Sequence, residues 1–234
     1  MYHSVSQHEG DYNPLCTSPE RFEAQMLYLK RQNLRGVTMR ELHLKRKSGD
    51  TRGLIGLTFD DGYEDFLNAA VPMLEKVGFS ATVFVIAGML GKENTWEHEG
   101  GRRSRLSLLD TDSVREVSER GMEVGSHTIS HPRLSGLDSE TLVREVSDSR
   151  QILSEILNEP VDGFCYPYGD LDIRAVRAAR EAGYDFAVAV KKQVEGGLYD
   201  WPRIYVGERD SSFRFGAKLK LSPILAEWRR RPPG

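Results

Sequence analysis

An apolar run that ends in two adjacent carboxylates is the feature that constrains this chain most. Residues 54–62 read Leu-Ile-Gly-Leu-Thr-Phe-Asp-Asp-Gly. A short, mostly apolar run bounded by a turn signal predicts a buried parallel strand. Asp60 and Asp61 then lie at its carboxyl end, where α/β folds place their chemistry. Because consecutive side chains on a strand point to opposite sides, both carboxylates face one cavity only if the chain turns at once, which Gly62 permits. Two close carboxylates repel, so we expect a positive partner nearby. A strand end that caps the helix predicted over 63–77 is the simpler alternative.

Two further predicted strands also end in polar motifs. Residues 126–132 read Ser-His-Thr-Ile-Ser-His-Pro, and residues 164–169 read Phe-Cys-Tyr-Pro-Tyr-Gly. The spacing of His127 and His131 places both imidazoles on one side of a helical turn. Strand and helix patterns alternate along the chain, which predicts parallel strands. The three motifs are therefore expected to converge at the mouth of a parallel barrel.

Length and composition narrow the classes of protein. A chain of 234 residues fits a single α/β domain spanning positions 1–234. The formal net charge of −3 argues against a nucleic-acid partner. No apolar run has membrane-spanning length, and no signal peptide is visible at the start of the sequence. The two cysteines, Cys16 and Cys165, exclude a disulfide framework. A cytoplasmic location is expected, or export if the sequence lacks its leader, and the oligomeric state stays open.

Thr-Phe-Asp-Asp-Gly followed by Ser-His-Thr-x-x-His resembles the polysaccharide deacetylases, also called the NodB-type homology domain, a carbohydrate esterase type. The resemblance implies an irregular, incompletely closed (β/α)7-type barrel with about seven strands. It also implies a carbohydrate substrate and a metal-dependent hydrolase that removes N-acetyl groups from an N-acetylated amino sugar in an oligo- or polysaccharide. Hydrolysis of a small cyclic amide or ureide, as in allantoinase-like relatives, is one alternative. A carbohydrate-binding relative without activity is another, although the intact Asp-Asp and His-x3-His motifs argue against lost chemistry.

The resemblance makes Asp61, His127 and His131 the ligands of a divalent metal. Two imidazoles and one carboxylate suit Zn²⁺ and leave a position for water. Co²⁺, Mn²⁺, Ni²⁺ and Fe²⁺ are alternatives for the same ligand set. Ordinary core or surface histidines are the simpler interpretation of each histidine taken alone.

The resemblance also assigns roles to residues around the metal. Asp60 is the expected catalytic base, with orientation of a ligand as the alternative. The backbone N–H of Tyr168 is expected to stabilise the oxyanion, although Pro-Tyr-Gly by itself is typical of a turn. Many family members hold the base with an arginine at the position that Cys165 occupies here. Arg203, in Asp-Trp-Pro-Arg-Ile, is the candidate replacement, and a surface salt bridge is its alternative.

The general acid of the family departs from its usual place in this sequence. The family usually carries Leu-x-His near its C-terminus, whereas the last histidine here is His131. Circularly permuted members carry a Tyr-His segment at the N-terminus instead, and Met1-Tyr2-His3-Ser4 fits that pattern. His3 is therefore the predicted general acid, with an incidental histidine as the alternative. Trp201 resembles the aromatic wall of the family's acyl pocket, and a core tryptophan is the other interpretation.

Overall fold

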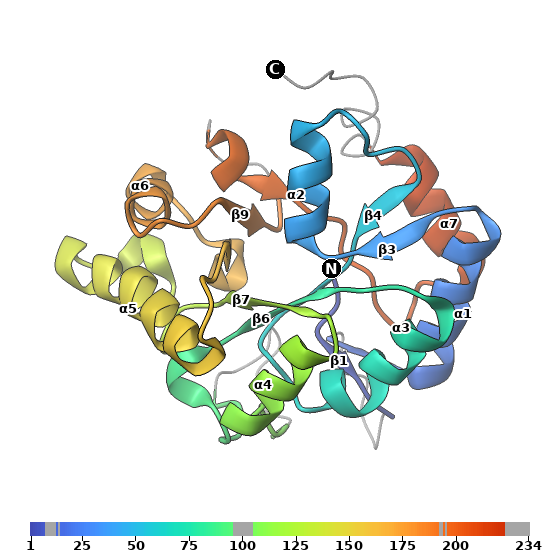
Figure 1. Ribbon diagram of the computed structural model, residues 1–234, viewed down its shortest axis with the longest axis horizontal. Helices are drawn as coiled ribbons and strands as arrows, with labels where there is room; N and C mark the ends of the chain where they lie inside the picture. The colour runs from blue at the N-terminus through green and yellow to red at the C-terminus, as the bar shows by residue number, and fades with distance from the viewer. Residues whose placement is uncertain (8–12, 14, 96–104, 192–193, 195, 223–234) are drawn as a thin grey trace.

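A curled sheet of six parallel strands forms the centre of the protein (Figure 1). The computed structural model describes residues 1–7, 13, 15–95, 105–191, 194 and 196–222. The strand order β10-β9-β8-β7-β6-β5 is parallel throughout, as the alternating pattern predicted. This is the predicted irregular, incompletely closed α/β barrel, with six strands in its main sheet. The strands of the main sheet are β5 (Thr58–Phe59), β6 (Thr82–Val85), β7 (Glu123–Ser126), β8 (Gly163–Cys165), β9 (Phe186–Ala189) and β10 (Trp201–Pro202). Two parallel pairs accompany it, formed by β1 (Ser4–Val5) with β2 (Cys16–Thr17) and by β3 (Arg35–Val37) with β4 (Leu54–Gly56).

Residues 1–3 lie between the two ends of the curled sheet. Tyr2 forms an isolated parallel bridge with Phe59 of β5. On the other side, the N–H of Val206, four residues beyond β10, donates a hydrogen bond of 3.0 Å to the carbonyl oxygen of Met1. The segment therefore occupies the position that a further strand would take in a closed barrel, and it brings His3 to the mouth.

Seven α-helices are described, and most of them pack on the outer face of the sheet (Figure 1). They begin at side-chain caps where the sequence offers them, such as Ser18 before Pro19 and Asp138 before Ser139. None of the described helices has the length and apolar content needed to cross a membrane. The α-helices are α1 (Pro19–Arg31), α2 (Met39–Lys47), α3 (Val71–Val77), α4 (Thr111–Glu119), α5 (Ser139–Leu157), α6 (Ile173–Glu181) and α7 (Ser212–Leu221). Short 3-10 helices are η2 (Ala87–Met89), η3 (Leu134–Gly136), η4 (Pro167–Gly169) and η5 (Gly197–Tyr199), and η1 (Phe66–Ala70) is a π-helix.

The apolar run over 54–59 is divided between two sheets. The sequence predicts one strand over 54–59, but β4 pairs with β3 and only β5 joins the main sheet. The chain changes partners at Leu57, whose N–H donates to Val37 and whose carbonyl oxygen accepts from Thr82. Helix α2 packs so closely on the β3–β4 pair that a Cβ at Gly56 would lie 2.5 Å from the sulfur of Met39. The charged residues over 45–52 predict a surface loop, but positions 45–47 still belong to α2.

Two further elements can be compared with the sequence pattern. Apolar spacing predicts a helix over 64–77 that contains Pro72, and the structure has the π-helix η1 followed directly by α3, with Pro72 in the first turn of α3. A proline is tolerated in the first turn of an α-helix. The pattern also predicts a strand over 204–206, but this strand is not formed and β10 ends before it.

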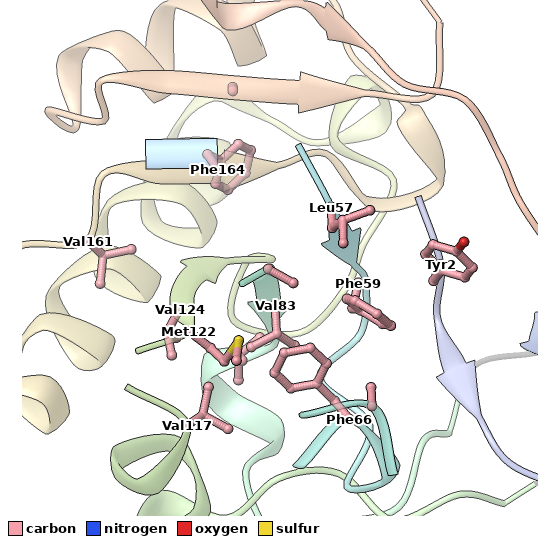
Figure 2. Packing of buried hydrophobic residues seen from close by; sticks show 14 of the residues in the cluster. Tyr2, Leu57, Phe59, Phe66, Val83, Val117, Met122, Val124, Val161 and Phe164 are labelled. Carbon is pink, nitrogen blue, oxygen red and sulfur yellow. The ribbon is translucent and has the colours of Figure 1, made fainter. Parts of the chain in front are cut away.

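The core has two parts, one on each face of the curled sheet. Side chains alternate along β9, so that Phe186 and Val188 point into one cluster and Ala187 and Ala189 into the other. The larger cluster joins the outer face to the helices, and Figure 2 shows part of it. The smaller cluster fills the inside of the curl beneath the mouth and consists of Val37, Met39, Leu42, Phe84, Cys165, Phe186, Val188 and Trp201. A filled interior leaves the carboxyl ends of the strands as the place for polar side chains.

Candidate metal centre and active site

The polar motifs meet at the carboxyl ends of three strands, as predicted. Asp60 and Asp61 follow β5, His127 follows β7, and Tyr168 lies beyond β8. The turn that brings the two carboxylates together begins one residue earlier than expected. Asp61 itself has a φ of 74°, and Gly62 continues the turn with a φ of 72°. The left-handed backbone at these two positions directs both carboxylates into the mouth.

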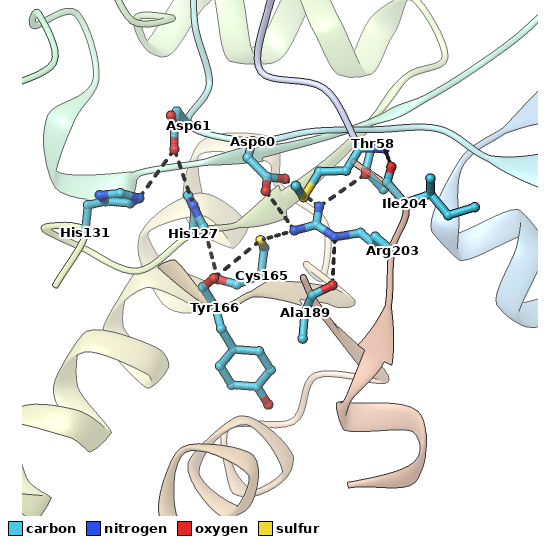
Figure 3. A network of polar contacts seen from close by, with 11 residues as sticks. Thr58, Asp60, Asp61, His127, His131, Cys165, Tyr166, Ala189, Arg203 and Ile204 are labelled. Carbon is cyan, nitrogen blue, oxygen red and sulfur yellow. Dashed lines mark hydrogen bonds and ion pairs between the residues drawn. The ribbon is translucent and has the colours of Figure 1, made fainter. Parts of the chain in front are cut away.

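Asp61, His127 and His131 form a buried cluster of possible metal ligands. The Oδ1 atom of Asp61 lies 3.4 Å from the Nε2 atom of each histidine (Figure 3). Two ligand atoms at tetrahedral positions around Zn²⁺ lie roughly 3.3–3.5 Å apart for the usual bond lengths. Burial opposes ionisation of Asp61, but hydrogen bonds with both histidines hold the pKa of its carboxyl well below the usual range. The cluster therefore has the composition, spacing and charge of a divalent metal site.

A main-chain contact fixes which nitrogen of His127 faces the cluster. Its Nδ1 atom lies 2.8 Å from the carbonyl oxygen of Cys165, at the end of β8. A carbonyl oxygen only accepts hydrogen bonds, so Nδ1 carries the proton and donates it. In the neutral imidazole, Nε2 then has a free lone pair directed at Asp61, which is the form that binds a metal.

The loop that carries the histidines is not the helical turn that their spacing suggested. Thr128 and His131 have left-handed backbones, with φ values of 69° and 63°. Glu145, a buried residue of α5, accepts the N–H groups of Ile129 and Ser130 at 2.9 and 3.0 Å. This carboxylate takes the backbone donors that a helix would use internally, and it holds the loop against α5. Sequence reasoning missed Glu145, whose only signal was a charged residue on the apolar face of α5.

Asp60 forms a buried, two-pronged ion pair with Arg203. The Nη1–Oδ1 distance is 2.6 Å and the Nη2–Oδ2 distance is 2.7 Å (Figure 3). Arg203 is 9% exposed and Asp60 is 4% exposed, so the surface salt bridge considered as an alternative does not apply. Burial raises the pKa of Asp60, but the charge and the hydrogen bonds of Arg203 outweigh it and lower the value to about 2. The positive partner expected for the carboxylate pair is therefore present.

Every N–H of the Arg203 guanidinium has an acceptor. Besides the two bonds to Asp60, Nε donates to the carbonyl oxygen of Ala189 at 3.3 Å and Nη1 to the hydroxyl of Thr58 at 3.2 Å. Nη2 also donates to the sulfur of Cys165 at 3.1 Å. The five donors thus connect the segment after β10 to β5, β8 and β9. Cys165, where the resemblance places the family's arginine, accepts a hydrogen bond from Arg203.

Tyr168 reaches the mouth through a left-handed backbone with a φ of 58°. Among the described residues, no hydrogen-bond acceptor is found for its backbone N–H. Its ring is 41% exposed, lies 4.6 Å from the ring of His131, and carries the Arg133 guanidinium 4.4 Å from its centroid. The structure thus brings the ring of Tyr168 beside a candidate ligand, with its N–H available to a bound molecule.

His3 lies beside the carboxylate pair. The residue before it, Tyr2, accepts a hydrogen bond of 3.0 Å from the Asp60 N–H. The Nδ1 atom of His3 is buried and has no hydrogen-bond partner in the part of the chain that the structure describes. Burial lowers the pKa of His3, and the charges of Asp61 and Asp60 oppose that effect. His3 is therefore close enough to both carboxylates to be affected by their charges.

Trp201 does not lie where the acyl-pocket prediction put it. Its ring stacks on Phe186 at 5.8 Å and packs beside His43 of α2 at the same distance. Both Trp201 and Phe186 begin their strands, so their rings lie inside the curl toward the ends opposite the mouth. The structure contradicts the pocket wall and supports the alternative, a core tryptophan that is 4% exposed.

Comparison with known families accounts for this arrangement. The family model described as polysaccharide deacetylase matches residues 47–187, which include both carboxylates, both histidines and the Pro-Tyr-Gly turn. The chain belongs to the polysaccharide deacetylase family. It is accordingly a hydrolase of that family, as the motifs implied.

Two curated relatives of this polysaccharide deacetylase span most of its length. The Bacillus subtilis (strain 168) protein YxkH is 29% identical over 225 residues, which cover 94% of this chain and 75% of that protein. The poly-beta-1,6-N-acetyl-D-glucosamine N-deacetylase of Staphylococcus aureus (strain MRSA252) is 24% identical over 204 residues, covering 82% of this chain and 68% of that protein.

Solved structures share the fold of this polysaccharide deacetylase. The Streptococcus pyogenes deacetylase PplD superposes with a TM-score of 0.79 at 24% identity, covering 92% of this chain and 94% of that one. IcaB from Ammonifex degensii superposes with a TM-score of 0.74 at 24% identity, covering 92% and 93% of the two chains. The curled sheet is thus the fold of known deacetylases.

Proposed function

We propose that this polysaccharide deacetylase removes N-acetyl groups from an N-acetylated amino sugar in an oligo- or polysaccharide. One observation carries the proposal: a possible metal site of one carboxylate and two imidazoles lies beside a second, ionised carboxylate at the mouth of the barrel. The S. aureus relative, which is named for N-deacetylation of poly-beta-1,6-N-acetyl-D-glucosamine, supports an amino sugar as the substrate.

Asp61, His127 and His131 are the proposed metal ligands, and Zn²⁺ is the proposed ion. The 3.4 Å spacings of the ligand atoms and the protonation of His127 at Nδ1 suit a tetrahedral site with one open position. A bound divalent ion supplies polarisation of the acetyl carbonyl and a water with a lowered pKa.

Asp60 is the proposed base that takes the proton of the attacking water. Arg203 donates one hydrogen bond to each carboxylate oxygen of Asp60, and each oxygen keeps a further lone pair. The pKa of about 2 means that Asp60 is fully ionised at neutral pH and ready to accept a proton.

Tyr168 and His3 complete the proposed set. The N–H of Tyr168, held by the left-handed backbone, is placed to donate to the developing oxyanion. Collapse of the tetrahedral species requires a proton on the leaving amine, which the imidazole of His3 supplies. Burial lowers the pKa of His3, and the carboxylates of Asp61 and Asp60 oppose this effect by favouring the protonated form that the step requires.

A substrate panel tests the function. Acetate release is measured from β-1,6- and β-1,4-linked N-acetylglucosamine oligomers and from peptidoglycan fragments, and ring opening is measured with allantoin. The Asp60→Asn protein serves as the matched control for metal-loaded but impaired enzyme. We expect the wild-type protein to release acetate from at least one acetylated glycan, and Asp60→Asn to release it at least about 100-fold more slowly. Turnover of allantoin alone would replace the proposal with a cyclic ureide hydrolase. Glycan binding without acetate release would make the protein a carbohydrate-binding relative.

A further inference from the structure

Tyr63 carries a buried hydroxyl for which the described residues offer no hydrogen-bond partner. The residue stands two positions after Asp61, is 1% exposed, and forms an antiparallel bridge with Leu108. A buried hydroxyl without a partner is destabilising, so native proteins rarely keep one without a reason. The position of Tyr63 beside the proposed metal site suggests where that reason lies.

Asp61 is the charged group that acts most strongly on this hydroxyl. Burial raises the pKa of Tyr63 well above its usual value, and the charge of Asp61 adds to the effect. A phenol is protonated at neutral pH and can donate its O–H. Asp61 directs Oδ1 at both histidines, which leaves its Oδ2 atom available to another donor.

We propose that Tyr63 is a positioning residue for the metal ligand Asp61. With the ion bound, its hydroxyl donates, directly or through one buried water, to the carboxylate oxygen that does not face the histidines. The arrangement matches the one around His127, whose Nδ1 atom is held by the carbonyl oxygen of Cys165. Two of the three proposed ligands are then oriented by a hydrogen bond from outside the cluster. The inference rests on the proposed metal site and extends it to a residue that neither contacts the substrate nor binds the ion.

The Tyr63→Phe variant isolates the hydroxyl, because the phenyl ring keeps the packing. The metal-free variant and wild type are titrated with Zn²⁺ in competition with a chromogenic chelator, below both melting temperatures. We expect Zn²⁺ affinity to fall about 10- to 100-fold, the usual effect of removing a group that orients a ligand. We also expect the Tm of the metal-free variant to be unchanged or higher, because the hydroxyl it loses is unpaired in that state.

Tyr184→Phe is the matched control. Tyr184 is equally buried, but its hydroxyl donates to the carbonyl oxygen of Val146 at 3.0 Å. Losing that bond should lower the Tm of the metal-free protein and leave Zn²⁺ affinity unchanged. The two variants are thus expected to show opposite patterns, one in affinity and the other in stability.

Unchanged Zn²⁺ affinity in Tyr63→Phe, with metal binding intact in wild type and lost in His127→Ala, would overturn the role of Tyr63 and leave the proposed function standing. A wild-type protein that takes up no Zn²⁺, Co²⁺, Mn²⁺, Ni²⁺ or Fe²⁺ would instead overturn the proposed metal-dependent function, and with it this inference.

Discussion

Replacing Arg203 with Met leaves the Asp60 carboxylate buried without its counter-ion. In the wild-type protein burial raises the pKa of Asp60, but the charge and hydrogen bonds of Arg203 lower it from 3.8 to about 2. Without the guanidinium, only the smaller effects of His3 and His127 oppose burial, so the pKa rises. A cation in contact lowers a carboxylate pKa by about 1–3 units, and both oxygens are paired here, so we expect a rise of about 2 units or more.

The sign of the effect on activity follows from the role of Asp60. The base works in its ionised form, so turnover falls as the pH drops through its pKa. The acid limb of the pH–rate profile should therefore move to higher pH in Arg203→Met. Arg203→Lys keeps the positive charge but cannot make all five hydrogen bonds, so its acid limb should move less.

Stability changes in the same experiment and has its own pH dependence. Removing one partner of a buried ion pair costs roughly 3–5 kcal/mol of the free energy of unfolding. In wild type, the folded pKa of Asp60 lies below the unfolded value. The pair's contribution is therefore present above about pH 4 and is lost as the pH falls toward 2. The loss of stability in the variant should consequently be largest near neutral pH, where Asp60 is an unpaired buried anion.

The assay is kcat/KM for acetate release across the acidic and neutral range, with metal content and circular dichroism recorded at every pH. Metal content separates protonation of Asp60 from loss of the ion, and circular dichroism identifies unfolded samples. An acid limb that coincides with that of wild type, in folded and metal-loaded Arg203→Met, would refute the reasoning. Arg203 would then serve the structure only.

Three further outcomes are expected from the same site. Purified protein should contain about one divalent ion per chain and lose it in His127→Ala and in His131→Ala; elemental analysis that finds undiminished metal in both would contradict the ligand set. Asp60→Asn should keep its metal and lose about 100- to 10,000-fold in turnover, whereas turnover near that of wild type would remove Asp60 from the mechanism. His3→Ala should keep its metal and lose about 100-fold or more with acetylated sugar, and less with an activated acetate ester, whose leaving group needs less protonation. A wild-type rate of His3→Ala on the sugar would exclude His3 as the acid.

The parts of the site that follow strand ends could be predicted from the sequence. Parallel strands place their carboxyl ends together, so Asp61 and His127 were expected to meet although they are far apart in the chain. A positive partner for the carboxylate pair was predicted from chemical need. Arg203 itself was named because the resemblance implies an arginine that the sequence lacks at its usual place.

Features set by tertiary contacts could not be predicted in this way. The spacing of His127 and His131 fits a helical turn, but Glu145 takes the backbone donors of the loop and stabilises left-handed residues instead. The change of sheet at Leu57 cannot be recognised in the apolar pattern, because the residues on both sides of Leu57 are similarly apolar. A tryptophan is equally suited to a pocket wall and to a core, and only the stacking of Trp201 on Phe186 shows that it belongs to the core.

The position of residues 1–3 between the two ends of the sheet imposes an order on folding. β5 gives this segment one neighbour early in synthesis, but its other neighbour, the main chain at Ile204, is 203 positions away and is made much later. Arg203 arrives with that neighbour, so until then Asp60 has no counter-ion and is costly to bury. Closing the gap in the sheet and neutralising Asp60 are therefore a single step. The three proposed metal ligands belong to the part of the chain made before that step, so the ligand set can assemble before the catalytic carboxylate is enclosed.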